Sequence, residues 1–204
     1  MIAQTLASTA ASDRRESATP VLGDDALIKQ VADGNKLAMR ALFARHQVRV
    51  YRFVLRIVRD GSLAEDVVSE VFIDAWQHAG RFEGRSTVST WLLGIARHKA
   101  LTAANRRSTE SIDSEAAMNV VDPAATPEAA LGQKDTGTVI RGCIAALSPE
   151  HAEIIDLVYY QEKSIREIVD ILCIPENTVK TRMFYARKRL AALVAAEGID
   201  RAAA

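Results

Sequence analysis

Apolar residues recur at three- and four-residue steps along residues 24–107. The first run contains Leu27, Ile28 and Val31, and further runs follow the Asp33-Gly34-Asn35 triplet. A repeat of this period is typical of helices that bury one face in a core, and an Asp-Gly-Asn triplet is typical of a turn. The pattern therefore predicts two helices at the start of this region, separated at the triplet.

Two more helices are predicted in the same region. Ser62 and Glu65 have the S-x-x-E spacing of an N-terminal capping box, and an apolar periodic run follows them. The polar, glycine-containing segment 82–87 predicts a loop, and residues 90–107 return to the helical period. Trp91 falls in the apolar register of that last helix, so we expect it to pack in the core.

The composition changes at both ends of this region. Residues 1–23 are rich in Ala, Ser and Thr and have no apolar period, so they are predicted to form a disordered tail, and residues 197–204 are predicted to form a second tail. Residues 108–135 are rich in Asp, Glu, Ala, Pro and Ser, which is typical of a linker. With no strand-like alternation, the predicted fold is all-α: two small helical domains, at 24–107 and 136–196, joined by a flexible acidic linker.

The second domain has the pattern of a helix-turn-helix. Ser164 and Glu167 form a second capping box, an apolar stripe follows, and a short turn at 173–175 leads into another helix. Apolar positions of that helix face inward at three- and four-residue steps. The positions left partly or wholly outward are Thr178, Lys180, Thr181, Arg182, Phe184, Tyr185, Arg187, Lys188 and Arg189. Such a face can read phosphates and base edges; the alternative is a solvated basic face on an ordinary bundle.

The net charge of zero conceals an uneven distribution. Residues 24–107 contain 14 Lys and Arg against 9 Asp and Glu, whereas residues 108–135 contain 1 against 6. Residues 136–204 contain 9 of each sign. The neutral total therefore argues only against tight non-specific binding of DNA by the whole chain.

Several classes of chemistry find no support in the sequence. The four histidines are scattered, and Cys143 and Cys173 have no CxxC spacing, so no metal site, cofactor, small-molecule substrate or catalytic constellation is predicted. We expect both cysteines to be buried free thiols, with a redox role for Cys173 left open. No secretion signal or membrane-spanning run is evident, which predicts a cytoplasmic protein without membrane insertion.

Three motifs, in order, resemble those of one family. Residues 64–76, A-E-D-V-V-S-E-V-F-I-D-A-W, are similar to the polymerase-docking helix of sigma factors. Residues 90–100, T-W-L-L-G-I-A-R-H-K-A, are similar to the following helix, which faces the minus-ten element. Residues 148–153, 164–168 and 174–182 resemble the promoter-reading carboxy-terminal domain. The chain thus resembles the extracytoplasmic-function (ECF, group IV) members of the sigma-70 family over nearly all of both domains.

This resemblance implies a non-enzymatic sigma factor that binds core RNA polymerase and directs promoter recognition, DNA melting and transcription initiation, in a stress or environmental response. It also implies an anti-sigma factor as a partner. Polymerase binding is carried over to Glu65, Asp66, Val67, Glu70 and Phe72. Minus-ten DNA binding is carried over to Phe82, Arg85, Arg97, His98, Lys99 and Arg106. Minus-thirty-five DNA binding is carried over to Thr178, Lys180, Thr181, Arg182, Phe184, Tyr185 and Lys188.

The sequence departs from the family pattern at several of these positions. His98 stands where the family usually has Asn, and Thr102 where an acidic residue is common, so the base preference at the minus-ten element is open. Cys173 and Asn177 replace common glycines, and we expect the turn to adjust to a side chain at 173. Tyr185 replaces a common Arg, which should alter contact with the minus-thirty-five element.

Two other classes of function are compatible with parts of this pattern. A free-standing helix-turn-helix regulator would bind duplex DNA alone and would not need an acidic docking helix, whose charges could simply be a solvated surface. A pure protein-interaction module would bind polymerase or an inhibitor without driving transcription. The acidic linker could enter the polymerase channel as a mimic of nucleic acid, or it could be a plain tether.

Overall fold

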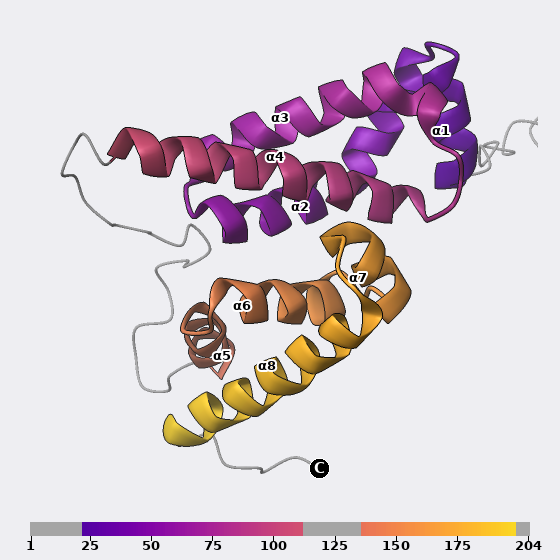
Figure 1. Cartoon of the computed structure of the whole chain (residues 1–204). Coiled ribbons are helices and arrows are strands. Elements are labelled where there is room, and N and C mark those ends of the chain that lie inside the picture. Colours follow the sequence, from indigo (N-terminus) through magenta and orange to yellow (C-terminus); the bar gives the residue numbers. More distant parts are fainter. Residues whose placement is uncertain (1–21, 112–135, 199–204) are drawn as a thin grey trace, which may run out of the picture.

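The chain forms two helical domains that stack on one another in a computed structural model (Figure 1). The structure describes residues 22–111 and 136–198. The parts of the predicted tails and linker that fall at residues 1–21, 112–135 and 199–204 lie outside the described residues. All regular elements within the described ranges are helices, which confirms the all-α class.

The first domain packs four helices around one apolar core. These are α1 (Asp24–Ala32), α2 (Lys36–Val58), α3 (Gly61–His78) and α4 (Val88–Ser111), with a 3-10 turn η1 (Ala79–Arg81) after α3. α2, α3 and α4 pack against one another, and α1 packs against α2. The largest fully buried side chains include Leu42, Phe53, Val54, Val71 and Leu92. Burying each such side chain stabilises the folded state by about 1.5–3 kcal/mol. The apolar period of the sequence therefore corresponds to residues that form the core.

The start of α3 differs from the sequence-based expectation. Asp60, not Ser62, caps this helix, and its carboxylate accepts a hydrogen bond of 2.9 Å from the Leu63 N–H. The capping box predicted at Ser62 and Glu65 is therefore wrong. The hydrogen bond from Leu63 and the nearby Arg107 guanidinium lower the pKa of Asp60, which keeps the cap ionised.

The fourth helix is longer than predicted. It begins at Val88 and ends at Ser111, whereas the sequence predicted residues 90–107. Thr87 acts as its cap, because the Thr87 hydroxyl accepts a hydrogen bond of 3.3 Å from the Thr90 N–H. The loop predicted at residues 82–87 lies directly before it.

The second domain contains α5 (Thr136–Ala145), α6 (Pro149–Ile155), a π-helical turn η2 (Asp156–Tyr160), α7 (Ile165–Leu172) and α8 (Glu176–Ala196). The predicted helix-turn-helix is formed by α7 and α8, which pack against each other. Its capping box is confirmed: the Ser164 hydroxyl accepts from the Glu167 N–H, and the Glu167 carboxylate accepts from the Ser164 N–H.

Cys173 adopts a left-handed backbone conformation in the turn between these helices. Its φ is 54° and its ψ is 42°, and its N–H donates to the Val169 carbonyl at 2.8 Å. The expectation that the turn adjusts to the side chain is wrong, because the conformation that favours glycine is kept. Cys173 is also exposed, so only Cys143 is a buried thiol. Asn177 lies in the first turn of α8 and needs no positive φ.

The variant Cys173→Gly should raise the free energy of unfolding of the second domain by about 0.5–1 kcal/mol, because glycine enters the left-handed region without a Cβ penalty. Urea denaturation of the full chain, followed by circular dichroism, measures this change. Cys173→Ala is the control: it removes the thiol, keeps the strain and should be nearly neutral. If the free energy of unfolding rose equally in both variants, loss of the thiol, not relief of backbone strain, would be the cause.

His46 joins α2 to the first turn of α1. It is buried, and its Nε2 lies 2.8 Å from the Asp24 Oδ2. Burial lowers the pKa of His46 below its ordinary value of 6.5, although Asp24 acts in the opposite direction. The unfolded chain therefore takes up a proton more readily than the folded one.

Because the folded pKa is the lower one, His46 contributes stability that is present above pH 6.5 and lost as the pH falls through the folded value. We expect the urea midpoint of the wild-type chain to fall between pH 7.5 and pH 5.5 by more than that of His46→Gln. Gln keeps a polar side chain without a titrating ring. If the urea midpoints of the two proteins fell by the same amount between pH 7.5 and pH 5.5, the assignment of this pH dependence to His46 would be wrong.

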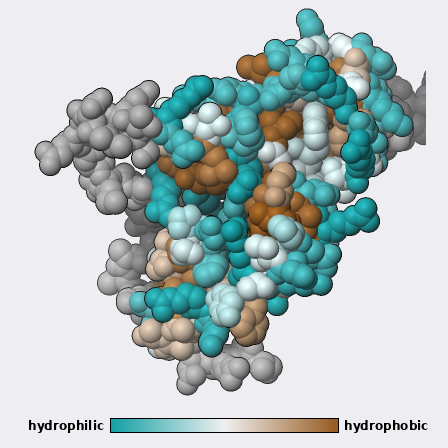
Figure 2. Space-filling model, viewed as in Figure 1, coloured by the Kyte–Doolittle hydropathy of each residue, from teal (hydrophilic) through white to brown (hydrophobic). Residues whose placement is uncertain are grey.

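The surface of the stacked domains is largely hydrophilic, with apolar side chains gathered in a few separate areas of the face shown in Figure 2. Among the described residues, no helix is both long and apolar enough to cross a membrane. Nor do the described ranges contain a cluster of three or more His, Cys, Asp or Glu side chains that could hold a metal ion.

Candidate nucleic-acid and protein interfaces

One surface of α3 is acidic, as its sequence predicted. Glu65, Asp66 and Glu70 are all exposed on this helix. Val67 and Phe72 were predicted to flank them, but their exposed fractions are only 2% and 4%. These two side chains belong to the core and offer no surface to a partner.

An apolar residue that the sequence reasoning missed lies on the exposed side of α3. Ile73 is 57% exposed and follows Glu70 by three residues, so it shares a helix face with Glu70 and Asp66. Its position outside the buried register of α3 was the signal available in the sequence. We call Glu65, Asp66, Glu70 and Ile73 the acidic face.

The loop between η1 and α4 carries the first of the predicted minus-ten residues. Phe82 is half-buried, and its ring centroid lies 5.4 Å from that of Trp91 at a tilted angle. Trp91 packs against the core, as predicted. Arg85 is exposed and forms an ion pair with Glu83. The loop thus places a half-buried aromatic ring near an exposed cation.

Further along α4, the predicted minus-ten cations differ in their surroundings. Lys99 Nζ lies 3.6 Å from the Glu70 carboxylate and 3.4 Å from that of Asp74, so α4 and the acidic face are electrostatically linked. His98 and Arg106 are exposed. Arg97 instead pairs with Glu153 of the second domain: its Nε donates a hydrogen bond of 2.8 Å to Glu153 Oε1.

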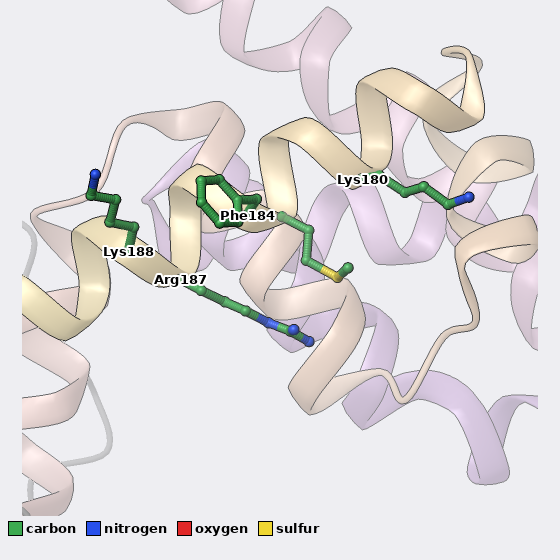
Figure 3. Close-up of a pocket in the computed structure, with 5 residues that line it drawn as sticks. Lys180, Phe184, Arg187 and Lys188 are labelled. Carbon is green, nitrogen blue, oxygen red and sulfur yellow. The ribbon is translucent and has the colours of Figure 1, made fainter.

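The outward face of α8 is basic and aromatic, as predicted. Figure 3 shows Lys180, Phe184, Arg187 and Lys188 leaving the helix along its length. Phe184 is 62% exposed and meets the ring of Tyr185, itself 53% exposed, edge-on at 5.3 Å. Large exposed rings beside cations suit contact with bases and phosphates rather than packing in a core.

Two predicted residues of α8 have ion-pair partners within their own domain, and a third is half-buried. Arg182 is half-buried and lies 3.2 Å from Glu150, and Lys180 lies 2.6 Å from Glu176. Thr178 is half-buried near the helix start. Lys180 remains exposed, and a surface pair of this kind is worth only about 0–1 kcal/mol, so the pair with Glu176 leaves its ammonium group available to another anion.

Arg187 was identified as outward but left out of the predicted DNA-binding set. The structure places it with Lys180, Met183, Phe184 and Lys188 around one shallow depression of α8. Its guanidinium also lies 5.7 Å from the centre of the Tyr159 ring. Its spacing of seven residues from Lys180 was the available signal.

Together, the exposed basic helix of the helix-turn-helix in the second domain and the acidic face of the first domain are typical of a DNA-binding transcription protein. Residues 42–110 match the family model for Sigma-70 region 2, and residues 138–190 match that for Sigma-70, region 4.

Two relatives extend the match over most of the chain. The ECF RNA polymerase sigma factor SigL of Mycobacterium tuberculosis is 32% identical over 184 residues, which cover 86% of this chain and 99% of SigL. The RNA polymerase sigma-H factor of Pseudomonas aeruginosa is 28% identical over 179 residues, which cover 82% of this chain and 91% of that factor. The chain belongs to the ECF family of RNA polymerase sigma factors, which are DNA-binding regulators. It acts with core RNA polymerase and promoter DNA to direct transcription initiation.

Solved structures show the same fold. The sigma factor RpoE of Bartonella quintana, in complex with the anti-sigma factor NepR, superposes with a TM-score of 0.65 at 23% identity, covering 79% of this chain and 98% of that one. CnrH, in complex with the cytosolic domain of CnrY, superposes with a TM-score of 0.62 at 22% identity, covering 85% and 97%.

Proposed function

We propose that three separate surfaces divide the work of initiation. The acidic face of α3 docks on core polymerase, the 82–87 loop and α4 hold the melted minus-ten strand, and α8 reads the minus-thirty-five duplex. The observation that carries this proposal is that the acidic face and the basic face of α8 are both exposed, on different domains.

The acidic face suits a basic protein surface. Asp66 and Glu70 lie one helical turn apart and are solvated, while Ile73 adds an apolar contact beside them. Charges at the rim of such a contact speed association and select the partner, and a central apolar side chain supplies affinity. Val67 and Phe72 support this face from the core, where the Phe72 ring meets that of Phe43 at 4.8 Å.

The loop and α4 suit a single strand whose bases have left the duplex. The half-buried Phe82 can stack with a base while resting on Trp91, so little side-chain freedom is lost on binding. Arg85 and Arg106 are exposed cations for phosphates, and the exposed His98 can meet a base edge.

The basic face of α8 suits the major groove of a duplex. Lys180 and Lys188 are exposed cations two turns apart, and Thr181 and Tyr185 are exposed polar side chains between them. Phosphate contacts set the register of the helix, while Thr181, Phe184 and Tyr185 can reach base edges. Arg187, in the same depression, joins this set.

We further propose that the chain is a non-enzymatic, cytoplasmic subunit that serves a stress or environmental response and is held by an anti-sigma factor. The complexes of RpoE with NepR and of CnrH with CnrY support the last point, because both proteins share this fold. Membership of a family of DNA-binding regulators supports the non-enzymatic role.

Run-off transcription with purified core polymerase on a random promoter library tests the proposal. A sigma factor of this kind should yield transcripts that share two sequence elements, and it should be retained by immobilised core polymerase. Binding of duplex DNA without core, together with no transcript, would instead favour a free-standing regulator.

A further inference from the structure

Arg182 stands apart from the other cations of the recognition helix α8. It follows Val179 by three residues and precedes Ala186 by four, and both of these side chains are fully buried. Positions three and four apart share a face of a helix, so Arg182 lies at the edge of the inward face. Its side chain is 25% exposed, against 52% for Lys180. The outward face that we assign to duplex DNA therefore lies on another side of the helix.

The guanidinium of Arg182 is held by a carboxylate of α6. One of its terminal nitrogens lies 3.2 Å from Glu150 Oε2. Glu150 belongs to the first turn of α6, whereas Arg182 lies near the middle of the DNA-facing half of α8. The ion pair therefore ties the start of one helix to the body of the other.

α6 is the element along which the recognition helix rests. It packs alongside α8 (Figure 1), and the contact is apolar: Ile154 and Ile155 of α6 and Ala186 of α8 are buried almost completely. Apolar contacts of this kind are non-directional, so they hold the two helices together without fixing how α8 turns about its own axis. A charge-assisted hydrogen bond is directional and can fix that rotation.

The rotation of α8 matters because it decides which side chains face the duplex. Successive residues of an α-helix are separated by about 100° around the axis, so a modest turn exchanges the residues at the centre of the outward face for those at its edge. Thr181, Phe184 and Tyr185 are all exposed and lie on different sides of this face. Their reach toward base edges therefore depends on a contact that lies outside the DNA-facing surface.

The pair formed by Lys180 and Glu176 provides the contrast. Both residues belong to α8, and the Lys180 Nζ lies 2.6 Å from Glu176 Oε1. The hydrogen bond and the charge of Lys180 lower the pKa of Glu176. A pair within one helix cannot orient that helix against another element, so Glu176 only competes with other anions for Lys180.

We propose that Arg182 is a positioning residue for recognition of the minus-thirty-five element. Its ion pair with Glu150 fixes the rotation of α8 at which the outward side chains meet the duplex, and Arg182 itself does not contact DNA. This inference deepens the proposed function and rests on it, because it takes α8 to be the helix that reads the upstream duplex.

Two variants that remove a carboxylate partner from an α8 cation, E150Q and E176Q, test the inference. The holoenzyme of each is titrated with a labelled duplex that carries the upstream element selected by run-off transcription. E176Q should bind at least as tightly as wild type, because the loss of a negative charge favours binding of a polyanion. E150Q should bind about 3- to 10-fold more weakly, at the lower end of the couplings between residues in contact. If Arg182 contacted DNA, E150Q would free its guanidinium and strengthen binding.

The variant R182M removes the charge and keeps an apolar side chain at this position. It should weaken binding as much as E150Q does, and E150Q/R182M should lose no more than either single variant, because both changes break one contact. The slope of log K against log salt should match wild type. A slope reduced by about 0.9 in R182M, which marks a lost phosphate contact, overturns the inference. So do additive losses in the double variant, or wild-type affinity in E150Q.

A duplex of scrambled sequence separates positioning from a general loss of stability. E150Q should bind this duplex at least as tightly as wild type, because non-specific binding depends on charge. The ratio of the two affinities should therefore fall. An equal loss on both duplexes, accompanied by a lower urea midpoint, assigns the effect to folding and overturns the inference. If the wild-type holoenzyme does not distinguish the two duplexes, the proposed reading by α8 has failed instead.

Discussion

Reversing two charges on the acidic face, in the variant D66K/E70K, is expected to reduce run-off transcription by at least about 100-fold. Each reversal replaces an attraction to a basic partner with a repulsion, and close charge pairs at protein interfaces couple by about 1.5–7 kcal/mol. A combined loss of about 3 kcal/mol already corresponds to more than 100-fold in affinity. Lys99, which now pairs with Glu70, would add repulsion within the domain.

D25K/D33K provides the comparison for this prediction. It changes the net charge by the same amount at exposed residues of α1 that lie outside the acidic face, in the cleft beside the 82–87 loop. This variant should bind immobilised core polymerase as tightly as wild type, and both proteins should show the same helical circular dichroism. If D66K/E70K bound immobilised core polymerase as tightly as wild type, α3 would not be the docking surface.

The variant K180A/K188A is expected to weaken binding of the holoenzyme to a duplex carrying the upstream promoter element by about 10- to 100-fold. Both lysines are exposed on α8, and each phosphate contact removed should reduce the slope of log K against log salt by about 0.9. The slope is the sharper measurement, because it counts contacts whatever the sequence of the element.

A pair of exposed cations on α2 serves as the control for this slope. K36A/R40A removes the same charge from the first domain, far from α8 in the sequence. Its salt slope should match wild type. An unchanged slope in K180A/K188A would remove α8 from the duplex contact, even if affinity fell for another reason.

The helices could be predicted from sequence because their apolar period matches the core that they bury. The same period already marked Val67 and Phe72 as inward, and only the resemblance to the family drew them into the docking set. Ile73 is the opposite case, because its position outside the buried register indicated that this apolar side chain is exposed. Residue type alone was a weaker guide here than position on the helix.

Local caps were predicted less well, because neighbouring residues compete for the same role. Asp60 and Ser62 can both cap a helix, and the backbone path decides between them. At Cys173 the sequence showed that glycine is missing from the turn, but the left-handed conformation is held by contacts that the sequence does not display.

The contacts between the domains could not be predicted. Glu153 and Arg97 are 56 residues apart, and Glu167 and Thr90 are 77 apart. No periodic pattern links such distant positions, and the capping box fully accounted for Glu167 at the level of sequence. Its second oxygen accepts a hydrogen bond from the Thr90 hydroxyl only where the two domains meet.

The polar character of the contacts between the domains affects how the chain behaves over many rounds of use. Ion pairs and hydroxyl hydrogen bonds, once broken, are at once rehydrated by water, whereas a broken apolar interface leaves surface that attracts other proteins. Where the domains meet through ion pairs such as Arg97–Glu153 and Arg49–Glu162, separation therefore exposes groups that water hydrates at once.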